Sequence, residues 1–146
     1  MNAKAHAKPT SSFWLISGAA LIWNLFGLMI FVQTMMMTTE DRAAAFNEAQ
    51  VRFLDSIPMW ATAANGIAVV LGVAGCVLLL VRRALAVPVL IVSLAAIIVQ
   101  DLHTFVLNDA VALFGMFPVY IQSAVLVIAI ALIVYARRAA GRGLLK

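Results

Sequence analysis

Four long apolar runs make up most of the chain, and they restrict how it can fold more than any other feature. Each run has at least the roughly 20 residues that a helix needs to cross the hydrocarbon core of a bilayer. Apolar residues make up 65% of the 146 residues and charged residues only 11%, too few for the polar surface of a soluble domain. The sequence therefore predicts one all-α membrane domain, a four-helix bundle over 1–146. The predicted spans are about 13–37, 58–81, 86–107 and 112–136.

The first run follows a short basic tail, as the apolar core of a signal peptide does. A cleavable signal peptide has an apolar core of about 7–15 residues and a small-residue cleavage site after it. The run over 13–37 is longer than this, and no such site follows it. We therefore expect it to be retained as the first span.

A polar segment, 38–57, separates the first two runs. Thr39 precedes two acidic residues, which is typical of a helix start because acidic side chains favour the positive end of the helix dipole. Phe46, Ala49 and Phe53 then recur at helical spacing. This pattern predicts a short amphipathic helix that lies on the membrane surface or caps the bundle. The alternative is a plain solvated loop.

Small residues recur at every fourth position of the second run. Such a stripe allows two helix backbones to approach closely in lipid. We therefore expect a helix-packing face formed by Ala64, Ala68, Gly72 and Cys76.

The fourth run contains two residues that disfavour a continuous helix, Gly115 and Pro118. They predict a kink or a short broken helix between them.

The basic residues lie beside the apolar runs rather than on one solvated face, which argues against nucleic-acid binding. The segment 38–57 carries only two of the ten Lys and Arg residues, together with four of the six acids. The positive-inside rule then predicts that both termini are cytoplasmic and that 38–57 is extracytoplasmic. We also expect anionic lipid to bind the paired arginines Arg82, Arg83, Arg137 and Arg138. The other basic residues outside 38–57 are Lys4, Lys8, Arg142 and Lys146.

Motifs for catalysis or metal binding are missing from the sequence. Cys76 is the single cysteine, so no disulfide forms within one chain, and no zinc or haem-attachment spacing occurs. Hydrolase elbows, phosphate-binding loops and paired catalytic carboxylates are also absent. We therefore expect no enzyme activity, no cofactor and no metal.

Polar side chains within the spans are costly in lipid, so each is a candidate functional residue. From the rise of an α-helix, we expect Asn24 near the middle of the first span and the other candidates in the outer half of their spans. They would converge on an outward-facing polar cavity for a small solute or protons. Asp101 and His103 would be its titrating members, since imidazole changes charge near neutral pH. The alternative is an interhelical hydrogen-bond network that fixes the bundle. The candidates are Asn24, Asn65, Gln100, Asp101, His103, Thr104, Tyr120, Gln122 and Ser123.

Short motifs along nearly the whole chain follow a recognisable order. They are Leu21 to Gly27, Ile57 to Trp60, Gly72 with Gly75, Leu78 to Arg83, Ala86 to Pro88, Ser93-Leu94 and Gln100. In this order the chain resembles a group of small bacterial four-span membrane proteins that often carry the label "sugar transporter". It departs from them at Leu85 and Leu144, where an aromatic residue is expected. The resemblance implies four spans in a bacterial inner membrane.

Two functions remain open from the sequence. The first is a candidate transporter or binder of a small solute, with the polar cavity as its site. The second is a non-catalytic accessory or assembly subunit of a larger membrane complex, which docks through small-residue faces. Four helices enclose little room for a pathway, so we expect either a homo-oligomer or a larger complex.

Overall fold

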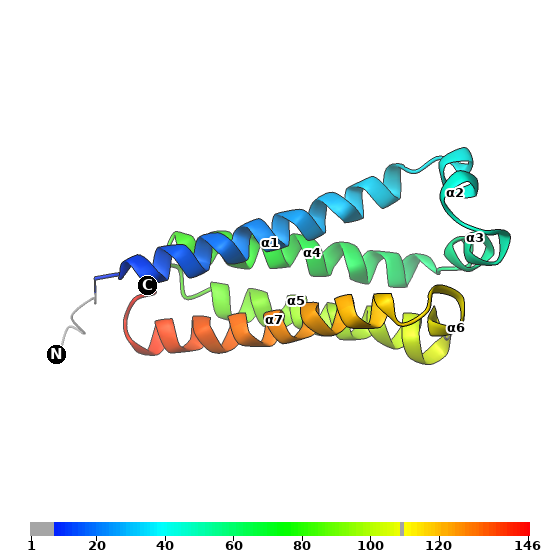
Figure 1. Cartoon of the computed structure of the whole chain (residues 1–146). Coiled ribbons are helices and arrows are strands. Elements are labelled where there is room, and N and C mark those ends of the chain that lie inside the picture. Colours follow the sequence, from blue (N-terminus) through cyan, green and yellow to red (C-terminus); the bar gives the residue numbers. More distant parts are fainter. Residues whose placement is uncertain (1–7, 109) are drawn as a thin grey trace.

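The computed structural model describes residues 8–108 and 110–146, and this part of the chain contains helices but no strand (Figure 1). The prediction of an all-α chain with four long apolar helices is confirmed. The long helices are α1 (Ser11–Met36), α4 (Met59–Leu80), α5 (Ala86–Asp101) with its π-helical continuation η1 (Leu102–Leu107), and α7 (Phe117–Gly141). The short helices are α2 (Thr39–Ala45), α3 (Glu48–Asp55) and α6 (Ala110–Phe114).

Four helical segments are long and apolar enough to cross a membrane: α1, α4, α5 with η1, and α7. The fourth begins at Phe117 rather than near 112, because the predicted break divides that run into α6 and α7. Gly115 has a φ of 73°, which glycine adopts without steric cost. Pro118 then lies in the first turn of α7, where its missing N–H is not needed.

The two ends of the bundle differ (Figure 1). We call the end where α1 begins and the C-terminus lies the tail end, and the end that contains α2, α3 and α6 the loop end. Along the bundle α1 packs on α4, α4 on α5, and α5 on α7. Between α1 and α7 there is little contact, and α1 diverges from the other long helices toward the loop end. The bundle is therefore open along one side.

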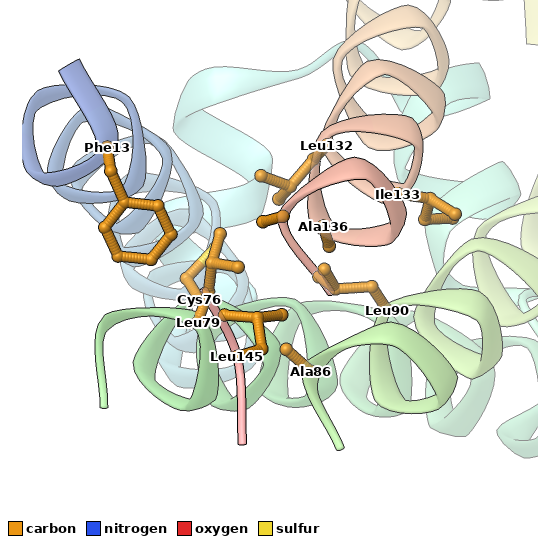
Figure 2. Packing of buried hydrophobic residues seen from close by; sticks show 10 residues of the cluster. Phe13, Cys76, Leu79, Ala86, Leu90, Leu132, Ile133, Ala136 and Leu145 are labelled. Atoms are coloured by element: carbon orange, nitrogen blue, oxygen red, sulfur yellow. The ribbon is translucent and has the colours of Figure 1, made fainter. Parts of the chain in front are cut away.

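The main apolar core lies at the tail end (Figure 2). Phe13 of α1 stacks on Tyr135 of α7 with ring centroids 6.3 Å apart, so these two helices do meet here. All four long helices and the C-terminal residues contribute to this core. Its buried members are Phe13, Cys76, Leu79, Ala86, Leu90, Leu132, Ile133, Ala136, Ala139 and Leu145.

The C-terminal residues close the tail end by pairing with the turn between α4 and α5. The Lys146 N–H donates to the Arg82 carbonyl at 2.6 Å, and the Ala84 N–H donates to the Lys146 carbonyl at 2.7 Å. Arg82 also donates from Nε to the Leu144 carbonyl at 2.7 Å. Leu145, between these bonds, is buried in the core. Backbone pairing and apolar burial therefore hold the same short segment.

The small-residue stripe of α4 is buried along its length, at Ala64, Ala68, Gly72 and Cys76. At Gly72 a Cβ atom would collide with the side chain of Asn24 in α1 and would also contact Ser93 in α5. The absence of a side chain at this position therefore permits both neighbouring helices to approach α4.

Two short helices stand where the sequence indicated one, because the segment contains two helix-start signals. Thr38 accepts the Asp41 N–H at 3.1 Å and donates its own N–H to the Asp41 carboxylate at 2.9 Å. Asn47 and Gln50 form the same reciprocal pair at the start of α3. Each pair satisfies backbone N–H groups that a helix start leaves without a partner.

Aromatic contacts hold these short helices to α6. The rings of Phe46 and Phe53 both meet the ring of Phe114 edge-on, at centroid distances of 6.3 and 5.6 Å. Gln50 adds a hydrogen bond from Nε2 to the Leu113 carbonyl at 3.0 Å. Two members of the predicted apolar stripe therefore face another part of the protein.

Candidate functional site

A groove of about 600 Å³ lies between α1, α4, α5 and α7, and we call it the central groove. Its volume is within the range of about 300–1,000 Å³ that is usual for small-molecule sites. The wall is mostly apolar, with a few polar side chains from all four helices. These polar residues are Asn24, Thr34, Asn65, Ser93, Gln100 and Gln122.

Three of these polar side chains are used in bonds within the bundle. Asn24 donates from Nδ2 to the carbonyl of Ala20, one turn earlier, at 2.9 Å and contacts Cys76 Sγ of α4 at 3.3 Å. Ser93 donates to the Ala68 carbonyl at 2.7 Å, which joins α5 to α4. Thr34 donates to a carbonyl of its own helix. Asn24 and Ser93 therefore help to hold α1, α4 and α5 together at the groove wall.

Two amide side chains of the groove have no such role. Among the described residues, Asn65 of α4 and Gln100 of α5 have no hydrogen-bond partner for their side chains. Each amide can donate two hydrogen bonds and accept others. The groove therefore presents unused donors and acceptors from two helices.

A second groove, of about 510 Å³, lies between α5, η1, α6 and α7, and we call it the side groove. Its wall is almost entirely apolar, with three polar residues, Asp101, Gln122 and Ser123. Gln122 borders both grooves. Although Gln100 and Asp101 are neighbours in the sequence, they line different grooves.

The carboxyl group of Asp101 is enclosed. Both of its oxygens are buried, and neither makes a hydrogen bond of ordinary geometry to any described residue. The Gln122 side chain is close enough to interact with this group. A carboxylate so placed is costly unless a cation or further donors compensate for the lost water.

His103, the other predicted titrating residue, lies in neither groove. Its ring is buried and meets Trp60 edge-on at a centroid distance of 5.1 Å. Nε2 is 3.0 Å from Asn108 Nδ2, which also donates to the His103 carbonyl at 2.9 Å. Nδ1 has no partner among the described residues.

The structure thus divides the predicted site residues into three groups. The central groove is lined by Asn24, Asn65, Gln100 and Gln122, and the side groove by Asp101, Gln122 and Ser123. The third group, His103, Thr104 and Tyr120, lines neither groove. Thr104 donates to the Gln100 carbonyl at 3.1 Å, and Tyr120 is exposed on α7. The sequence interpretation assumed α-helical spacing through 100–104. From Leu102 the chain is π-helical, which changes the rotation from one residue to the next.

Two polar residues of the central groove, Thr34 and Ser93, are not among the predicted site residues. Both are polar residues within apolar spans, so the criterion that selected Asn24 applies to them as well. Asp109, at the exit of the third predicted span, and Lys4 lie outside the described residues. The described residues also contain no group of three or more His, Cys, Asp or Glu side chains arranged to hold a metal ion.

Four long apolar helices, a buried small-residue stripe and grooves between the helices define the class: a multi-pass helical membrane protein. No protein-family model matches the chain, and no curated protein or solved structure matches it either.

Proposed function

We propose that this chain binds a small solute in the central groove and acts as its transporter. The proposed solute has hydrogen-bonding groups that pair with the amides of Asn65 and Gln100, and apolar surface that contacts the rest of the wall. The observation that carries the proposal is that these two amides are unused. A polar group without a partner is costly inside a membrane, so water or a solute is needed to satisfy it.

The proposed location is a bacterial inner membrane, with both termini in the cytoplasm and the loop end outside. The charge distribution supports this orientation. The tail end carries Arg82, Arg83, Arg137 and Arg138, which suit anionic lipid headgroups. At the loop end, Arg42 is paired with Asp55 at 2.8 Å, and Arg52 lies 3.6 Å from Glu48. Asn65 and Gln100 would then lie in the outer half of the bilayer.

The proposed assembly is a homo-oligomer, because the central groove is open between α1 and α7 and one chain alone does not enclose it. Native mass spectrometry from a mild detergent tests this directly. A defined multimer supports the assembly, and a monomer under all gentle conditions contradicts it.

Thiol labelling in a chain that lacks Cys76 tests whether water reaches the central groove from the outside of the membrane. In a Cys76→Ser background, a single cysteine at Asn65 is exposed to a charged methanethiosulfonate reagent that does not cross membranes. The matched control is Ile67→Cys, since Ile67 is on the same helix two residues away and is exposed at its apolar surface. We expect Asn65→Cys to react from the outside much faster than Ile67→Cys.

Equal, slow labelling of the two cysteines would contradict a water-filled groove. That result would favour the second function, an accessory subunit whose groove is filled by a partner helix. Labelling of Asn65→Cys from the cytoplasmic side only would contradict the proposed orientation.

A further inference from the structure

The side groove has Asp101 in its wall, which is apolar apart from this residue, Gln122 and Ser123. Of the described residues, none from α1 or α4 lines it, so it is formed separately from the central groove. The apolar wall includes Leu102, Phe105, Val119 and Leu126. Asp101 is the last residue of α5, directly before η1, and π-helical turns within longer helices often occur at functional sites.

Among the described residues, no cationic side chain compensates for Asp101. The ion pairs at the loop end join residues of α2 and α3, Arg42 with Asp55 and Arg52 with Glu48, and do not involve Asp101. Both carboxyl oxygens of Asp101 are buried and without a hydrogen bond of ordinary geometry. Bringing a positive charge beside a buried carboxylate removes much of the cost of its lost hydration.

The route to this site is through the lipid. At the surface of the chain the groove is bordered by Leu102 and Val106, which are 51% and 70% exposed. A molecule that dissolves in the bilayer can therefore enter the side groove from the side, and Asp101 is part of the wall that it meets there. A hydrated metal ion does not suit this wall, because such ions need several oxygen ligands.

We propose that the side groove binds a hydrophobic organic cation. Its charged centre, an ammonium or another onium group, pairs with the carboxylate of Asp101. Its apolar body lies against the groove wall formed by α5, η1 and α7. The amide oxygen of Gln122 and the hydroxyl of Ser123 are further acceptors beside the cation.

Binding of tetraphenylphosphonium tests this site in the full chain, reconstituted in phosphatidylcholine nanodiscs, with empty nanodiscs as the reference for partitioning into lipid. We expect saturable binding above that reference. The Asp101→Asn change should weaken it roughly tenfold or more, since removing one partner of a buried charge pair mainly speeds dissociation. Tetraphenylborate, of the same shape and opposite charge, should show no saturable binding.

Glu48→Gln is the matched control, because it makes the same chemical change at an exposed position of the loop end. It should leave binding unchanged. Equal binding by the wild-type chain and the Asp101→Asn variant would overturn the proposal, as would the absence of saturable binding to the wild type. A loss with Glu48→Gln equal to that with Asp101→Asn would also overturn it, since general surface charge would then explain the attraction.

Val119→Phe provides an independent variant if the aspartate change prevents folding. It keeps the carboxylate and fills part of the groove, so phosphonium binding should fall while helix content by circular dichroism stays the same. Unchanged binding in this folded variant would overturn the site. Labelling at Asn65 tests the central groove, whereas phosphonium binding tests the side groove. The proposed function and the cation site can therefore be contradicted independently of each other.

Discussion

The long helices are apolar at both the tail end and the loop end of the bundle, yet they pack differently at the two ends. At the tail end all four long helices and the C-terminal residues meet in one apolar core. Toward the loop end α1 and α7 are apart, two grooves lie between the helices, and short helices contact α6 through aromatic rings. The tail end therefore holds the helices together, whereas toward the loop end they leave the two grooves between them.

The placement of polar groups follows this difference. Asn24 and Ser93, nearer the tail end, bond to neighbouring helix atoms, whereas Asn65 and Gln100 have side chains without a partner among the described residues. A bonded amide stabilises the packing between two helices in lipid. An amide without a partner is available to a solute.

The largest expected effect is on stability at the tail end. Leu79 is fully buried there, so Leu79→Ala should lower the free energy of unfolding by about 2–5 kcal/mol through lost contacts and a cavity. The control is Leu15→Ala, since Leu15 is 74% exposed and its truncation should change that free energy by about 0.5 kcal/mol or less. Denaturant unfolding in one detergent, followed by circular dichroism, gives both values. Equal losses would show that the buried core at the tail end stabilises the bundle no more than the exposed surface of the same end does.

A smaller, local effect is expected at the loop end from Phe114→Ala. This change removes the ring that Phe46 and Phe53 both contact, at about 0.5–1.5 kcal/mol for each pair. Backbone amides of α2 and α3 should exchange hydrogen faster, while those around Leu79 keep their protection. Phe117→Ala, which removes an exposed ring at the same end, is the control. Equally faster exchange throughout the bundle would contradict the independence of the two ends.

The smallest expected effect concerns the start of α2. Hydrogen bonds from the backbone N–H and the hydroxyl of Thr38 lower the pKa of Asp41 below its ordinary 3.8. Because this pKa is lower in the folded chain, the stabilisation is complete above the unfolded pKa and is lost as the pH falls through the folded one. A carbon-detected NMR titration measures this pKa. Thr38→Ala should raise the pKa of Asp41 only part of the way back to 3.8, since the backbone hydrogen bond, which is the larger cause of the lowering, remains. A pKa of Asp41 at or above 3.8 in the wild-type chain would contradict the capping geometry.

Much of the fold was predictable because it depends on local chemistry. The four spans follow from the length of the apolar runs, and the break before α7 follows from the backbone freedom of Gly115 and the fixed ring of Pro118. The division of 38–57 into two helices has a local signal as well. Asn47 followed by Gln50 forms a second capping pair, and the prediction of a single helix did not take it into account.

The candidate site was predictable only as a set of polar residues. The sequence picked out most of the polar residues that line the grooves, but it also grouped His103, Thr104 and Tyr120 with them. Side-chain direction was predicted from α-helical spacing, and the π-helical turn after Asp101 changed that spacing. Such a turn has no clear signal in an apolar segment, because its stability depends on what packs around it.

The sequence by itself determined that this chain consists of apolar helices of membrane-spanning length, and where most of them begin and end. Only the tertiary structure decided that α1 and α7 meet at the tail end but separate toward the loop end, and that Gln100 and Asp101 line separate grooves. The physical reason is that a helix in lipid is apolar on every face. Hydrophobic periodicity therefore cannot tell a face in contact with another helix from a face in contact with lipid. Which faces meet depends instead on shape, as at the small residues of α4, and shape is a property of the packed helices together.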